Sequence, residues 1–122
     1  MRPLLALAAV LVAGSLSSGA LAAGATMYTP PLSSRGDDLH CSILNASSNT
    51  ASATVTGFSN GVPSTDTLTL KPGKMGSLSA LCGPACLAYC RFVTNFPASS
   101  FRVSACISQV GTDNPSVCAE GH

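Results

Sequence analysis

Residues 101–109, Phe-Arg-Val-Ser-Ala-Cys-Ile-Ser-Gln, have the most regular pattern in the chain of 122 residues. Apolar and polar or small side chains alternate along this segment. One set comprises Phe101, Val103, Ala105 and Ile107, and the other comprises Arg102, Ser104, Cys106 and Ser108. Successive side chains of a β-strand point to opposite faces, so the segment predicts a strand with one buried face.

The same period of two recurs elsewhere in the chain. It is found in residues 39–44, 52–59, 64–70, 75–81 and 88–95. Asn60-Gly61 predicts a tight hairpin turn, and Pro72-Gly73 predicts a chain reversal after residues 64–70. The five residues of Phe96–Ser100 could join the last two strands as a hairpin, which would place Cys90 opposite Cys106.

Several short alternating segments with no amphipathic helix predict an all-β fold. The expected architecture is an antiparallel β-sandwich, immunoglobulin-like in broad terms and stapled by disulfides, with a small closed barrel as the alternative. We expect this domain to span residues 39–110. An extended, loosely ordered leader over residues 23–38 would precede it, and a polar tail over residues 111–122 would be held back by Cys118.

The first twenty-two residues have the pattern of a secretory signal peptide. Arg2 precedes an unbroken apolar run over residues 4–13, and the small-residue sequence Ala20-Leu21-Ala22 follows. Glycines and serines interrupt the apolar stretch, which is shorter than the roughly 20 residues of a membrane-spanning helix. The sequence therefore predicts cleavage after Ala22 or Ala23 and a secreted or periplasmic product.

The charge balance excludes several classes of partner. The formal net charge is +1, and 9% of the residues are charged. Binding to nucleic acid or to an anionic membrane surface needs clustered Lys and Arg, which the chain lacks. We expect an unknown protein or surface partner, no nucleic acid, and no membrane contact once the signal peptide is removed. The oligomeric state is left open.

Six cysteines follow the predicted signal peptide: Cys41, Cys82, Cys86, Cys90, Cys106 and Cys118. An even number of cysteines in a small exported chain indicates disulfides. Six cysteines can pair in 15 ways, and the spacing alone does not choose among them.

A second function class uses the cysteines as thiols. Cys82, Cys86 and Cys90 recur every four residues, which on a helix would place them on one face as a redox or metal-handling cluster. Against this, Cys82-Gly83-Pro84-Ala85-Cys86 has one residue more than a thioredoxin-type motif, and exported thiols are normally oxidised. A thiol-redox or metal-handling role for this cluster is therefore the alternative function.

Candidate catalytic residues are few. The histidines are His40, next to Cys41, and His122, and the only adjacent acids are Asp37-Asp38. Nucleophilic catalysis needs a base positioned beside the nucleophile, and no G-x-S-x-G motif is present. The sequence predicts no enzyme, no catalytic residue, no cofactor and no metal site.

Three segments are candidate contact surfaces for a binding module. They are the Asn60–Thr65 turn, the Phe96–Ser100 loop, and the pair Tyr89 and Arg91. Arg91 and Arg102 could form a cross-strand patch if their strands are neighbours. A free sheet edge could also take up a partner by strand addition. Asn45-Ala46-Ser47 additionally fits the N-glycosylation pattern.

Four short motifs follow one another at spacings that resemble a group of small exported bacterial β-sandwich proteins without a characterised activity. They are Cys41-Ser42-Ile43-Leu44-Asn45, Leu70-Lys71-Pro72-Gly73, Tyr89-Cys90-Arg91-Phe92 and Arg102-Val103-Ser104-Ala105-Cys106. Cys82 and Cys86 look like additions to that pattern, so the resemblance suggests that they pair with each other. It implies no activity and no catalytic residue.

Overall fold

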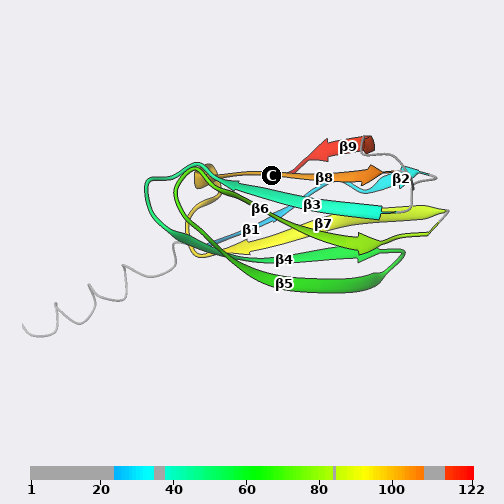
Figure 1. Cartoon of the computed structure of the whole chain (residues 1–122), viewed down its shortest axis with the longest axis horizontal. Coiled ribbons are helices and arrows are strands. Elements are labelled where there is room, and N and C mark those ends of the chain that lie inside the picture. The colour runs from blue at the N-terminus through cyan, green and yellow to red at the C-terminus, as the bar shows by residue number, and fades with distance from the viewer. Residues whose placement is uncertain (1–23, 35–37, 84, 109–114) are drawn as a thin grey trace, which may run out of the picture.

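The protein is a sandwich of two antiparallel β-sheets (Figure 1). The computed structural model describes residues 24–34, 38–83, 85–108 and 115–122. The predicted signal peptide, residues 1–22, lies outside the described residues. Among the described residues, no helix is long and apolar enough to cross a membrane.

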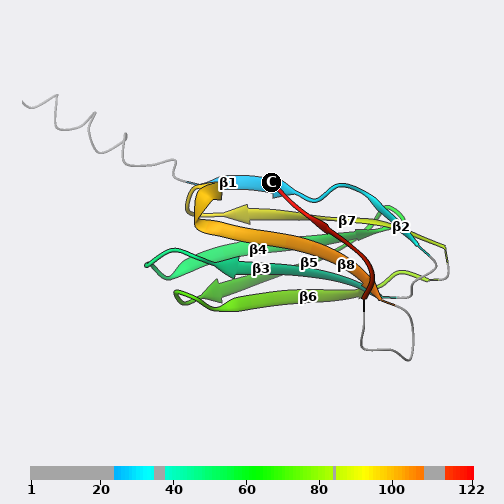
Figure 2. The ribbon, with the colours of Figure 1, turned by 90° about the horizontal axis from the view of Figure 1, so that it is seen from above.

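The strands of both sheets run along the long axis of the molecule (Figures 1 and 2). Sheet A has the order β1-β7-β4-β5, and β2 also pairs with β7; sheet B has the order β6-β3-β8-β9. The strands of sheet A are β1 (Ala25–Tyr28), β2 (Leu32–Ser34), β4 (Ala51–Ser59), β5 (Val62–Leu70) and β7 (Cys86–Thr94). Those of sheet B are β3 (Asp38–Asn45), β6 (Met75–Leu81), β8 (Phe101–Ser108) and β9 (Pro115–Glu120).

The predicted alternation is confirmed over Phe101–Ser108, and Gln109 lies outside the described residues. The apolar set of β8 is buried between the sheets, and the outward set faces away from the core. The core is completed by inward side chains of β3, β4 and β7, of which Phe92 is the largest that is fully buried. The all-β sandwich expected from the sequence is therefore the fold of the chain.

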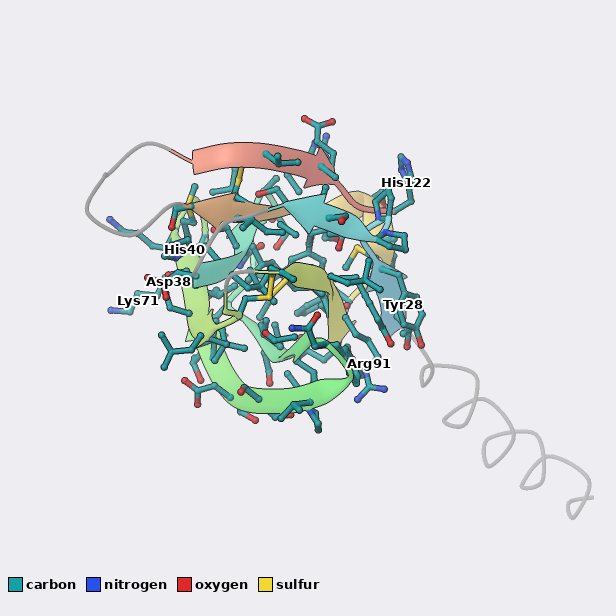
Figure 3. All side chains as sticks on the ribbon, turned by 90° about the vertical axis from the view of Figure 1, so that its right-hand side faces the viewer. Tyr28, Asp38, His40, Lys71, Arg91 and His122 are labelled. Carbon is teal, nitrogen blue, oxygen red and sulfur yellow. A yellow bond between two sulfur atoms is a disulfide. The ribbon has the colours of Figure 1, made fainter. Side chains whose placement is uncertain are left out.

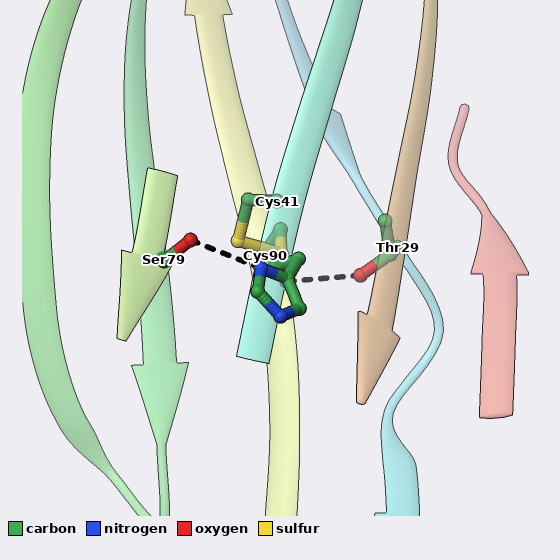
Figure 4. Close-up of a disulfide and its surroundings, with 5 residues drawn as sticks. Thr29, Cys41, Ser79 and Cys90 are labelled. Atoms are coloured by element: carbon green, nitrogen blue, oxygen red, sulfur yellow. Dashed lines mark hydrogen bonds between the residues drawn. A yellow bond between two sulfur atoms is a disulfide. The ribbon is translucent and has the colours of Figure 1, made fainter. Parts of the chain in front are cut away.

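A disulfide joins the two sheets through the centre of this core. Cys41 lies on β3 and Cys90 on β7, and neither residue is exposed (Figure 4). Immunoglobulin domains also carry a disulfide between their two sheets. The hydroxyl of Thr29 accepts the backbone N–H of Cys90 at 2.9 Å, so the chain before β2 is tied to the same place.

The predicted Asn60-Gly61 hairpin is also confirmed. Ser59 pairs with Val62, so β4 and β5 are joined by a loop of two residues. Asn60 and Gly61 have φ values of 51° and 85°. Positive φ at both central positions is the conformation that a twisted two-residue hairpin needs, and asparagine and glycine adopt it most easily.

The hairpin expected between β7 and β8 is wrong. The two strands belong to different sheets, and residues 95–100, including a short 3₁₀ turn at Ala98–Ser100 (η2), cross from sheet A to sheet B. Cys90 and Cys106 are therefore not cross-strand neighbours and do not pair. The period of two identifies the buried face of a strand, but it carries no information about which sheet the strand joins.

The expected boundaries of the sandwich are too narrow. The segment expected as a loosely ordered leader contributes β1 and β2, which pair with β7 and place Met27 and Leu32 in the core. The tail contributes β9, which pairs with β8, and the Cys106–Cys118 disulfide holds it there as expected. Pro30-Pro31 lies between β1 and β2 and interrupts the pairing with β7 only there. The segments before and after the two prolines are both β-strands.

Candidate functional site

The six cysteines form three disulfides. The pairs are Cys41–Cys90, Cys82–Cys86 and Cys106–Cys118. The pairing of Cys82 with Cys86, suggested by the resemblance, is confirmed. The proposed cluster of Cys82, Cys86 and Cys90 is divided between two bridges, because β7 carries Cys90 into the core opposite β3. Within the described ranges, no group of three His, Cys, Asp or Glu side chains is placed to hold a metal ion.

Tyr89 and Arg91 lie on the outer face of sheet A, where both contact a third side chain. Phe58 of β4 stacks on Tyr89 with 4.6 Å between ring centroids, and the guanidinium carbon of Arg91 lies 5.2 Å from the Phe58 centroid. Phe58 was missed at the sequence level because its neighbours come from another strand. Phe58 therefore contacts both side chains across β4 and β7, and cross-strand contacts of this kind stabilise a sheet.

The three expected contact segments do not form one surface. The Asn60–Thr65 turn lies beside the start of β7, where the N–H of Asn60 donates to the carbonyl of Leu87. Phe96–Ser100 follows the other end of β7. Arg91 and Arg102 are on different sheets, so the expected cross-strand arginine patch is wrong.

His40 has partners that the sequence could not indicate. Its Nδ1 is 2.9 Å from the hydroxyl of Ser79 on β6, and its Nε2 is 2.9 Å from the hydroxyl of Ser108 on β8. A catalytic triad instead uses one ring nitrogen for the nucleophile and the other for a carboxylate. With a serine on each nitrogen, His40 links the three neighbouring strands of sheet B.

Asn45 is buried, and both the nitrogen and the oxygen of its side-chain amide form hydrogen bonds. Nδ2 donates to the carbonyls of Asn49 at 2.7 Å and Leu70 at 2.9 Å, and Oδ1 accepts the N–H and the hydroxyl of Ser47. A glycan on Nδ2 would replace one of the two hydrogens that Nδ2 donates, and it needs space that the buried site lacks. The matching sequence pattern therefore marks a structural asparagine in the folded chain.

Replacing Asn45 by alanine is expected to lower the free energy of unfolding by about 2–3 kcal/mol, because the buried carbonyl of Leu70 and the part-buried carbonyl of Asn49 lose their donor. Urea denaturation followed by circular dichroism measures the change. Asn49→Ala is the matched control, since only the backbone of Asn49 takes part in these bonds. Equal stability of the two variants would contradict the structural role of Asn45.

The free edge of β6 is the least protected edge of the sandwich. The N–H of Asn45 donates to the carbonyl of Lys74, so these two residues form a hydrogen-bonded pair at the end of the β3–β6 ladder. Hydrogen-bonded and non-hydrogen-bonded pairs alternate along the ladder from this point. Gly76, Leu78 and Ala80 therefore direct their backbone groups toward β3, whereas those of Met75, Ser77, Ser79 and Leu81 point to the open edge. The outward N–H groups have no hydrogen-bond partner among the described residues.

Side chains of β5 itself protect the free edge of this strand against pairing with another strand. Pro63 has no N–H to offer at an outward position, and the carboxylate of Asp66 accepts the outward N–H of Thr67 at 2.9 Å. Proline and charge are devices that keep sheet edges from pairing with other chains. The sequence of β6, Met-Gly-Ser-Leu-Ser-Ala-Leu, contains neither.

The other two edges are partly covered or carry a charge. Tyr28 of β1 exchanges two backbone hydrogen bonds with His122, so the C-terminal residues close this side of the sandwich (Figure 3). The edge strand β9 begins at Pro115 and ends at Glu120. Of the described edges, β6 is the one that combines seven residues, no charge and no proline.

A shallow hollow of about 230 Å³ lies on the outer face of sheet B. Met75 and Leu44 supply apolar lining, and Arg102 and Glu120 supply opposite charges. The hollow is open to solvent, and Met75 connects it to the β6 edge.

The comparisons with known proteins bear on the fold alone. The crystal structure of Thermotoga maritima 1070 superposes with a TM-score of 0.52 at 15% sequence identity, covering 80% of this chain and 91% of that chain. No protein-family model and no curated protein matches the sequence. The likeness in structure supports the sandwich architecture and carries no activity with it.

Proposed function

We propose that the protein is an exported, disulfide-stabilised binding module without catalytic chemistry of its own, and that it takes up an extended segment of a partner protein by strand addition at β6. The observation that carries the proposal is the row of unpaired backbone groups along β6. An extended peptide completes such a row with main-chain hydrogen bonds, and its alternate side chains supply specificity.

The side chains of β6 describe the segment that would fit. On the outer face Met75 and Leu81 are 65% and 84% exposed, and Ser77 and Ser79 lie between them. A segment with apolar residues at its ends and small polar residues at its centre would match this pattern. Because β6 carries no charge, binding should depend only weakly on salt.

Export is the part of the proposal that rests on the sequence. The pattern of residues 1–22 is that of a signal peptide, and three disulfides are typical of proteins from oxidising compartments. Together the two observations support the proposed secreted or periplasmic location. The alternative, a thiol-redox or metal-handling protein using Cys82, Cys86 and Cys90, requires free thiols in the native chain, and alkylation of any of these three would favour it.

Amide hydrogen exchange tests the free edge directly. In the unliganded protein, Gly76, Leu78 and Ala80 should exchange slowly, and Ser77, Ser79 and Leu81 rapidly. A seven-residue peptide of alternating Val and Thr serves as the probe. Its addition is expected to protect the outward set and to shift those amide resonances first.

A proline substitution at the β6 edge distinguishes binding through backbone hydrogen bonds from binding through side-chain contacts. Ser77→Pro removes one outward N–H without breaking a β3–β6 bond, and Ser77→Ala removes the hydroxyl alone. We expect the proline variant to bind the probe at least about ten-fold more weakly, as the loss of one or two hydrogen bonds implies, and the alanine variant to bind normally. Equal binding by the two variants, or resonance shifts centred on Tyr89 and Arg91, would overturn the proposal.

A further inference from the structure

The three disulfides differ sharply in their access to solvent. Cys41 and Cys90 are completely buried, and Cys82 and Cys86 are 6% and 1% exposed. In the third bridge Cys106 is half-buried and Cys118 is exposed. Thiol–disulfide exchange requires a thiolate to reach a sulfur atom, so access separates this bridge from the other two.

The position of the third bridge in the sheet explains its exposure. Cys106 and Cys118 are directly opposite each other on β8 and β9, with Cα atoms 4.1 Å apart. The N–H of Gly121 donates to the carbonyl of Val103, which makes Cys106 and Cys118 a non-hydrogen-bonded pair, the closer kind in an antiparallel ladder. Both side chains point to the outer face of sheet B, and β9 is the last strand of that sheet.

We propose that Cys106–Cys118 is a thiol-exchange site that reacts with a dithiol reductant while the rest of the protein stays folded. The attacking thiolate bonds to Sγ of Cys118, the Sγ–Sγ bond breaks, and Cys106 leaves as a thiolate that takes up a proton. The second thiol of the reductant then displaces Cys118. In total the dithiol loses two electrons and two protons, and the protein gains two thiols.

The structure separates this bridge from the body of the fold. Opening it removes one covalent link across a loop of 12 residues, whereas the Cys41–Cys90 bridge continues to join the two sheets. The backbone bonds of Gly121 and His122 to Val103 and Tyr28 also remain. The reaction therefore changes the outer face of sheet B without requiring the core to open.

Limited reduction of the native protein with dithiothreitol tests the site. The thiols are trapped with iodoacetamide at successive times and located by peptide mass spectrometry. We expect Cys106 and Cys118 to be alkylated at least about ten-fold sooner than the other four cysteines, because buried sulfurs react only after opening. Simultaneous alkylation of all three bridges, or earlier opening of Cys82–Cys86, would overturn the proposal.

Two matched variants test which sulfur is attacked. Cys106→Ser leaves Cys118 as a free thiol, and Cys118→Ser leaves Cys106. With glutathione disulfide as the probe, we expect the Cys118 thiol to form the mixed disulfide several-fold faster, because it is the exposed partner. Equal rates in folded variants would contradict attack at Cys118. If either variant fails to fold, the order of reduction in the unaltered chain decides the proposal.

Discussion

Replacing Cys41 and Cys90 together by alanine is expected to lower the free energy of unfolding by about 4 kcal/mol. The bridge closes a chain segment of 49 residues, so its loss greatly increases the freedom of the unfolded chain. It also removes the one covalent link between the sheets at the centre of the core. Denaturation in guanidinium chloride measures the change, and the melting temperature should fall by about 15–30 °C.

The Cys82–Cys86 bridge supplies the control for this prediction. It closes a segment of only 4 residues, for which the same loop-closure argument gives about 2 kcal/mol. Cys82→Ala with Cys86→Ala should therefore cost about half as much as the loss of the inter-sheet bridge. An equal or larger loss of stability in the control pair would show that loop-closure entropy does not determine how much each disulfide stabilises the protein.

The parts of the fold that could be predicted from the sequence are those that depend on local chemistry. The alternation of residues 101–109 reports which side chains are buried, and Asn60-Gly61 adopts positive φ more easily than most pairs. Both are properties of neighbouring residues. They hold whatever the rest of the chain does.

The errors concern relations between distant segments. A five-residue connection between two good strands suggested a hairpin, but residues 95–100 cross between the sheets, and β8 instead pairs with β3 and β9. Residues 25–34 belong to the segment 23–38, which was expected to be a loosely ordered leader because it has the tandem prolines Pro30-Pro31, glycine and no periodicity. Met27 and Leu32 nevertheless alternate into the core on either side of the prolines, which the short length of each strand concealed.

At the candidate sites, too, features of the local sequence could be predicted, whereas contacts between distant segments could not. The absence of charge and proline in β6 is visible in the sequence, but only the sheet order shows that β6 has a free edge. The partners of His40 are 39 and 68 residues away, and no local pattern joins them. Tyr89 and Arg91 were predicted as a pair on one strand, but their contact residue Phe58 on β4 was not predicted.

Truncation of Phe92 to alanine is expected to cost about 3–5 kcal/mol, which is comparable to the loss of the inter-sheet bridge. Phe92 is completely buried and lies directly between Met27 of β1 and Val55 of β4. Its removal would leave a cavity at the point where the N-terminal strand joins sheet A. Thermal unfolding monitored by circular dichroism measures the loss, and accelerated amide exchange in β1 would locate it.

Val93→Ala is the matched control, because Val93 follows Phe92 on the same strand and is 44% exposed on the outer face. A surface truncation of this kind should change stability by less than about 1 kcal/mol. If Phe92→Ala does not fold, Phe92→Leu keeps an apolar side chain in place and should still be less stable than the Val93 variant. A larger loss at Val93 than at Phe92 would mean that the outer face of sheet A is covered in solution. Such a result would place the partner-binding surface around Tyr89 and Arg91 and not at the β6 edge.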